Sequence, residues 1–204
     1  MDKIKLASEI DRWAAETDDE SLAEDMRATA KIIRAEIAKT YAERTSGKTV
    51  YDAIERIRKR GEEKHEGFSG AIFDRLHPEK WIVVDTYVAV RKSGAPIVRI
   101  SEIQSKLTLD TFMSYDCPKI ALPDIAELKL YCRERKYTAK NAWKAEPYFL
   151  DCVEEVCVNP MYLIDAMESL PGCVAVYNAK QKCVCFSAES GDGILMCMRP
   201  PKNN

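Results

Sequence analysis

Residues 158–172, with the sequence VNPMYLIDAMESLPG, decide the fold that this chain is expected to adopt. Asn159 is a favoured residue just before a helix, and Pro160 suits the first helical position because its missing N–H would have no partner there. Apolar residues follow at helical spacing until Pro171 and Gly172 end the helix. The stretch therefore predicts a short helix with one apolar face.

Short strands are predicted on both sides of this helix. Runs of apolar and β-branched residues alternate with turn-forming residues, which is typical of short antiparallel strands. The predicted strands cover residues 153–158, 173–177, 182–187 and 193–198. With the helix they form one β-α-β-β-β unit.

A second β-α-β-β-β unit is predicted earlier in the chain, with weaker signals. Its helix is expected over residues 51–60, because Ala53, Ile54 and Ile57 would share one face. Its strands are expected over residues 68–76, 81–84 and 87–91. The fold class is therefore α+β, with two half-units of the same kind.

These units set the predicted domain organisation. Residues 47–204 form a single domain, with half-units at about 48–92 and 153–199. The insertion at 93–152 is long for a loop, so it should hold structure of its own. Within it, strands are predicted inside 97–107 and at 118–122, and a helix is predicted from Asp124 to about Arg135.

Residues 1–46 are predicted to be a helical extension in the form of a hairpin. Thr17 and Glu20 match a capping box, in which two side chains satisfy N–H groups at the start of the second helix. Apolar residues at helical spacing make a stripe on that helix, at Leu22, Met26, Ile33 and Ile37. The stripe serves either self-association or packing against the rest of the chain.

Two motifs near the C-terminus resemble the end of bacterial DNA sliding clamps, the beta subunit of the replicative DNA polymerase. The helix is similar to the clamp pattern N-P-x-Y-L-L-D-A-L, and the matching residues are Asn159, Pro160, Tyr162, Leu163, Ile164, Asp165, Ala166 and Met167. The stretch GDGILMCMR at 191–199 is similar to the last clamp strand, which ends M-P-M-R. Cys197 replaces the proline of that pattern, and the chain continues past its usual end.

A third motif resembles the clamp strand pair written roughly as L-V-A-T-D-G-H-R-L-A-V. Its counterpart is WIVVDTYVAVR at 81–91, where Asp85 matches the motif's aspartate and Tyr87 stands where histidine or tyrosine is common. Thr86 replaces the turn glycine, so the turn geometry should differ. The resemblance implies a DNA-clamp-like domain built from the two half-units.

The resemblance also implies a function without catalysis, because clamps tether polymerase and repair proteins to DNA. Their peptide-binding pocket is lined by the M-P-M-R strand and the T-D-G-H-R-L segment. The corresponding residues here are Val84, Thr86, Tyr87, Val88, Leu195, Met196, Met198 and Arg199. Methionine suits such a pocket because its flexible thioether adapts to different ligands.

Basic residues define a candidate DNA-binding set. They lie on the helix of the first half-unit and in the insertion, at Arg56, Arg58, Lys59, Arg60, Arg133, Arg135, Lys136 and Lys140. In the insertion they alternate with Tyr137 and Trp143, a combination that suits single strands or a phosphate backbone. A solvated helix end would have the same composition.

Catalysis, cofactors and metals are not predicted. The GKT triplet at 47–49 lacks a phosphate-loop glycine, because position 42 is Ala. The eight cysteines lie mostly in apolar strand patterns, without the spacing or histidine partners of a zinc site. We expect reduced thiols and a cytoplasmic protein. No apolar run reaches the roughly 18 residues of a membrane span.

The sequence thus favours a sliding-clamp-like replication or repair accessory protein that binds partner peptides and DNA. The alternative is a protein-interaction or regulatory module, of phage or mobile-element type, that keeps the clamp fold without tethering DNA. Acidic residues on the second helix, Asp165 and Glu168, favour the alternative. We expect a monomer or homodimer, because a ring of six clamp domains would require six copies of this chain.

Overall fold

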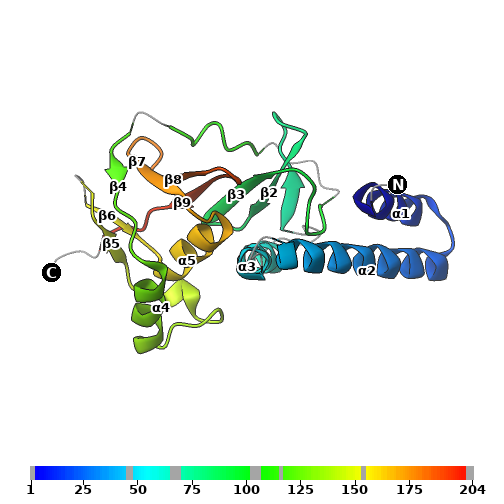
Figure 1. The fold of residues 1–204 in the computed structure, drawn as a ribbon, viewed down its shortest axis with the longest axis horizontal. Coiled ribbons are helices and arrows are strands. Elements are labelled where there is room, and N and C mark those ends of the chain that lie inside the picture. Colours follow the sequence, from blue (N-terminus) through cyan, green and yellow to red (C-terminus); the bar gives the residue numbers. More distant parts are fainter. Residues whose placement is uncertain are drawn as a thin grey trace.

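The computed structural model describes residues 3–44, 48–64, 70–101, 107–114, 117–152 and 155–200, without the side chains of 3–5 and 35–44. In these residues the chain is an α+β protein with a mostly antiparallel sheet (Figure 1). The predicted α+β class is therefore confirmed, whereas the DNA-clamp-like architecture stays a prediction. Phe68, Val153 and the side chain of Ile37, which belong to predicted elements, lie outside the described residues.

The main sheet has the strand order β1-β2-β3-β9-β8-β7-β4. Its strands are β1 (Ala71–Phe73), β2 (Lys80–Val84), β3 (Val88–Ser93), β4 (Lys119–Ile120), β7 (Val174–Asn178), β8 (Cys183–Ala188) and β9 (Gly191–Met196). The strands β3 and β9 pair antiparallel at its centre, with Val88 opposite Leu195. Each predicted meander is therefore present, and the two meet through their last strands.

A helix precedes each meander: α3 (Lys48–Lys64) comes before β1, and α5 (Pro160–Ser169) comes before β7. The strand β6 (Val156–Val158) leads into α5 and pairs with β5 (Tyr148–Leu150) in a separate small sheet. The first unit differs from its prediction. It has no leading strand in the described part of the chain, because the helix α2 (Glu20–Arg44) runs up to residue 44, close to the start of α3.

Both helices pack on one face of the sheet. The core between them and the strands includes Ile54 and Ile57 of α3, Leu163 of α5, and Trp81 and Phe186 of the sheet. The other face is covered by the segment 107–113, whose Leu109 is fully buried against Ile82 and Cys185. The helix α3 keeps an exposed side, whereas nine of the ten residues of α5 are buried.

Side chains anchor α5 at both ends. At its start, Asn159 Oδ1 accepts the backbone N–H groups of Met161 and Tyr162 at 3.0 and 3.4 Å, while its Nδ2 donates to the carbonyl of Ala142 at 2.7 Å. At its end, the buried Lys92 donates from Nζ to the carbonyl of Ser169 at 3.0 Å. A cation there also complements the negative end of the helix dipole.

A glycine brings the end of α5 close to the centre of the sheet. A Cβ atom on Gly193 of β9 would lie 2.8 Å from the carbonyl oxygen of Ala89 and 3.2 Å from the side chain of Leu170. The motif glycine therefore allows close approach between β9, β3 and the residue that follows α5.

The helices α1 (Lys3–Glu16) and α2 form the predicted hairpin through small residues spaced seven apart. The buried contacts are Ala7 and Ala14 on α1 and Ala23 and Ala30 on α2. Leu22 of the apolar stripe on α2 is exposed. A role of the stripe in self-association therefore stays a prediction. The capping box is wrong. Because α2 begins at Glu20, Asp19 is the residue that caps it, accepting the N–H of Leu22.

The insertion forms a lobe beside α5, which we call the α4 lobe and define as residues 125–145 (Figure 1). It contains α4 (Ile125–Glu134), which is capped by Asp124 as predicted, and the short 3-10 helix η1 (Ala142–Lys144). The strand predicted at 118–122 is present as β4. The part of 97–107 that the structure describes, 97–101 and 107, contains no strand.

We expect Asn159→Ala to destabilise the protein more than Asp124→Ala. Both changes remove a helix cap, which costs about 1 kcal/mol, but only the first leaves the buried carbonyl of Ala142 without this donor, for a total of about 2–4 kcal/mol. Urea unfolding of the two variants measures the difference. Equal losses would show that the bond to Ala142 contributes nothing.

The buried Lys92 should make stability depend on pH. Burial lowers its pKa from 10.5 to about 8. Between these values the unfolded chain keeps the proton that the folded chain has released, so the stability contributed at Lys92 rises with pH. The free energy of unfolding of the wild type minus that of Lys92→Met should be flat well below pH 8, rise between about pH 8 and 10.5, and level off above 10.5. A flat difference throughout would contradict this.

Candidate functional site

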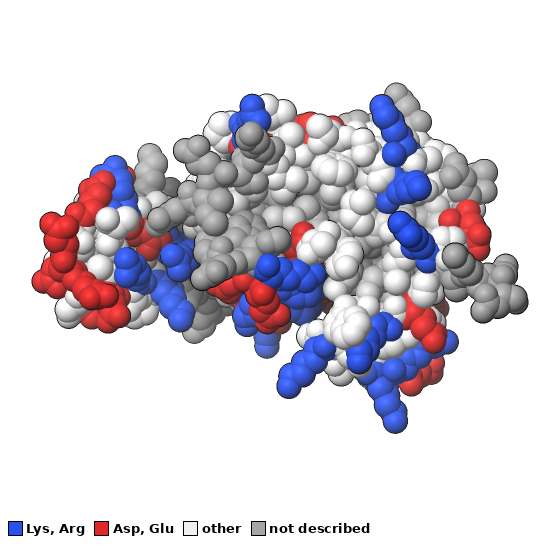
Figure 2. Space-filling view, turned by 180° about the vertical axis from the view of Figure 1, so that it is seen from behind, with Lys and Arg blue, Asp and Glu red and all other residues white. Residues whose placement is uncertain are grey.

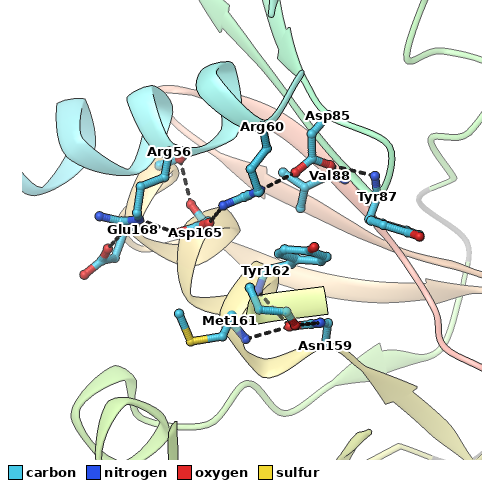
Figure 3. Close-up of polar contacts among 12 residues, drawn as sticks. Arg56, Arg60, Asp85, Tyr87, Val88, Asn159, Met161, Tyr162, Asp165 and Glu168 are labelled. Carbon is cyan, nitrogen blue, oxygen red and sulfur yellow. Dashed lines mark hydrogen bonds and ion pairs between the residues drawn. The ribbon is translucent and has the colours of Figure 1, made fainter. Parts of the chain in front are cut away.

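The stretches that resemble clamp motifs meet in space around Arg60 of α3. Its Nε donates to Asp85 at 2.7 Å, and its Nη1 donates to Asp165 at 2.6 Å (Figure 3). Asp85 lies in the β2–β3 turn and also accepts the backbone N–H groups of Tyr87 and Val88. We call this cluster of Arg60, Asp85, Tyr87, Tyr162 and Asp165 the motif junction.

A second arginine extends the ion pairs along the interface between α3 and α5. Arg56 donates to Asp165 at 2.6 Å and also pairs with Glu168, which contacts Lys129 of α4 at 2.5 Å. Both acidic side chains of α5 are almost fully buried. The argument that Asp165 and Glu168 favour the alternative function therefore fails, because these carboxylates point into the protein and are neutralised there.

Burial and ion pairing act in opposite directions on these groups. Burial raises the pKa of Asp165, and the attraction of Arg60 and Arg56 offsets it only in part. Burial also opposes the charge of the two arginines, but Asp165 and its neighbouring carboxylates outweigh it and raise the pKa of both guanidinium groups. The arginines therefore stay charged at any pH at which the protein is folded.

Aromatic contacts complete the motif junction. The rings of Tyr87 and Tyr162 stack with their centroids 5.5 Å apart, and the Arg60 guanidinium lies 4.7 Å from the centroid of Tyr162. The backbone N–H of Met196, at the end of β9, donates to the carbonyl of Tyr87 at 2.8 Å. All three motif stretches are thus neighbours, although up to about a hundred residues separate them in the chain.

The predicted peptide-binding residues fall into three groups by their exposure. Thr86, Tyr87 and Arg199 are exposed. Val84, Met196 and Met198 are half-buried. Val88 and Leu195 are buried in the core below the helices, where they pair across β3 and β9. These two residues cannot line an open pocket, because inward side chains alternate with outward ones along a strand.

The predicted DNA-binding residues of α3 are mostly occupied by partners inside the protein. Arg56 and Arg60 pair with carboxylates of α5 and the β2–β3 turn, and Arg58 pairs with Glu55 and Glu62 on its own helix. Lys59 is exposed. The expected basic face of α3 is therefore largely offset by acidic residues, which periodicity alone did not indicate.

The predicted basic residues of the insertion differ from those of α3 in their exposure and ion pairing. Arg133, Arg135, Lys136 and Lys140 lie exposed on the α4 lobe, where Lys and Arg side chains project from the surface in Figure 2. In the described part of the chain none of them forms an ion pair with an acidic residue. Trp143 lies on the same lobe and is 67% exposed.

Sequence reasoning missed a second buried ion cluster. Arg91 on β3 is 3% exposed and pairs with Asp74, Asp110 and Asp192 at 2.8–3.0 Å. The hydrogen bonds that Arg91 donates to these carboxylates outweigh burial and raise its pKa. In the sequence, Arg91 has the appearance of a charged residue at the end of a strand. It is buried only because the segment 107–113 covers it.

The cysteines, the metal-ligating side chains and the helices add three findings. All eight cysteines are free thiols, and the closest pair described, Cys183 and Cys185, has its sulfur atoms 3.9 Å apart. No group of three or more metal-ligating His, Cys, Asp or Glu side chains occurs among the described residues. Across the same residues, none of the helices combines the length and apolar character needed to cross a membrane.

Comparisons with known proteins give no relative. No protein-family model, no curated protein and no solved structure matches this chain.

We expect Asp165→Asn to destabilise the protein by about 3 kcal/mol, because Arg56 and Arg60 would each lose a buried counter-charge. The matched control is Glu62→Gln, which removes a half-exposed partner of Arg58 and should cost less than about 1 kcal/mol. Chemical denaturation measures both. A loss at Asp165 no larger than the control would show that the motif junction does not hold the helices together.

Proposed function

We propose that this chain is a non-enzymatic protein-interaction module with a clamp-like fold, which binds short linear peptides and does not encircle DNA on its own. One observation carries the proposal: the three stretches that resemble clamp motifs converge on the motif junction. Its partners would be replication or repair proteins, because the peptides that clamps bind come from such proteins.

The arrangement of the sheet supports the clamp-like part of this proposal. Two helix-and-meander units join through β3 and β9, so that the strand order on one side of the centre mirrors the order on the other. Clamp domains pair half-units of this kind. Asn159 caps α5, and Gly193 allows close packing at the centre of the sheet. Both motif residues therefore have a structural role in this arrangement.

The exposed side of the motif junction supports peptide binding. Tyr87 is 43% exposed and lies beside the end of β9, with Thr86 on one side and Met198 and Arg199 following the strand. An aromatic ring, a thioether and a guanidinium group suit a site that grips an apolar side chain and a carboxylate or carbonyl. The proposed peptide site therefore consists of Thr86, Tyr87, Met198 and Arg199, which are four of the eight residues predicted from the sequence.

Two observations weigh against encirclement of DNA. The helix α5 is covered by the α4 lobe, by α3 and by Tyr87, so it has no free face to turn toward a duplex. The arginines of α3 are paired with carboxylates and offer little net positive charge. Non-specific DNA binding depends on cations that can replace the counterions of phosphates.

DNA tethering remains the second candidate function. The α4 lobe favours it, because its four predicted DNA-binding residues, Arg133, Arg135, Lys136 and Lys140, form no ion pair in the described residues. A tether at this lobe would hold DNA from one side. The proposed module then would be a monomer or homodimer that contacts partners at the motif junction and nucleic acid elsewhere.

Titration of a fluorescent clamp-binding peptide tests the proposed function. Tyr87→Ala and Met198→Ala should each weaken binding by roughly 10-fold, as expected for residues at the centre of an interface. Val174→Ala, an exposed apolar residue at the start of β7, is the matched control and should bind as the wild type does. Absence of binding by the wild type, or equal affinity in all folded variants, would refute the peptide site.

A further inference from the structure

The end of α4 holds a lysine where glycine would fit better. Lys136 has φ 55, in the left-handed region that side chains disfavour. Its N–H donates to the carbonyl of Arg133, and the N–H of Tyr137 donates to that of Cys132, which is the usual hydrogen bonding at a helix end. Glycine is the common residue at this position, so a cation is present at a steric cost.

Cations on both sides of Lys136 form no ion pair in the described part of the chain, although the guanidinium of Arg135 lies 3.7 Å from the centroid of the Tyr131 ring. Arg133 and Lys140 are exposed and form no ion pair in the residues that the structure describes. The acidic residues of the α4 lobe, Glu127 and Glu134, and the adjacent Glu146 are exposed too and form no ion pair there. The arginines of α3 are paired, so the two basic sets are physically different.

An exposed aromatic ring lies on the same lobe. Trp143 in η1 is 67% exposed, and Lys144 Nζ lies 4.8 Å from the centroid of its ring. The position of η1 is held by the bond from Asn159 to Ala142, and the turn before it is held by Asn141, which accepts the N–H of Thr138. The ring is therefore presented on an anchored segment.

We propose that the α4 lobe binds single-stranded nucleic acid, with phosphates on Arg133, Lys136 and Lys140 and an unpaired base stacked on Trp143. Every base has a π-face, so stacking accepts any sequence, whereas the bases of a duplex are already stacked and paired. This surface lies outside the motif junction, and the inference does not depend on the proposed peptide site.

Fluorescence anisotropy with a labelled oligothymidylate of about 20 nucleotides tests the proposal. The protein should bind it more tightly than a duplex of equal length. Affinity should fall as salt rises, with a logarithmic slope near −2, from about −0.7 for each of three phosphate contacts. An oligouridylate of the same length shows whether DNA or RNA is preferred. Absence of binding at low salt, or tighter binding of the duplex, would overturn the proposal.

Two variants separate binding from folding. Trp143→Ala should weaken binding by roughly 5- to 150-fold, which is the usual effect of losing one stacked base. Lys136→Gly should weaken binding while its thermal midpoint stays equal or rises, because glycine relieves the left-handed backbone. Lys180→Ala, an exposed lysine in the β7–β8 turn, is the control. Wild-type affinity in both folded lobe variants would refute the site.

Discussion

The pairing of Arg60 with Asp85 and Asp165 holds together the parts of the molecule that the chain separates most widely. One guanidinium joins α3, the turn between β2 and β3, and α5. Burying three charges is costly unless each finds hydrogen bonds. Asp85 has backbone N–H groups from Tyr87 and Val88, and Asp165 has Arg56 as a second partner. Both carboxylates of the motif junction therefore have several partners, whereas Arg60 Nη2 is buried without a hydrogen-bond partner in the described part of the chain. The stacked tyrosines cover the cluster.

The two helix-and-meander units are alike in strand order but not in surface. The helix α3 has one exposed side, whereas α5 is enclosed by α3, the α4 lobe and the β2–β3 turn. The lobe comes from the insertion between the units, and the bond between Asn159 and Ala142 fastens it to the start of α5. The insertion thus buries the acidic residues of α5 and carries a separate basic surface outward.

Local signals allowed much of the fold to be predicted. The caps at Asn159 and Asp124 depend on backbone N–H groups two and three residues away, so sequence spacing specifies them. The meanders follow from alternation and turn residues. The cap of α2 was misplaced by two residues because Thr17 and Asp19 both have capping side chains, and the choice depends on where α1 ends. The candidate basic residues were found, but their ion pairs were not.

The sequence by itself determined the α+β class, the two meanders and the caps of α4 and α5, because each depends on residues within a few positions of one another. Only the tertiary structure decided which charges are free. Arg56 and Arg133 are both basic helix residues in the sequence, yet Arg56 meets carboxylates more than a hundred positions away, and Arg133 meets none among the described residues. Such pairing depends on how α3, α4 and α5 pack, and no local pattern encodes that.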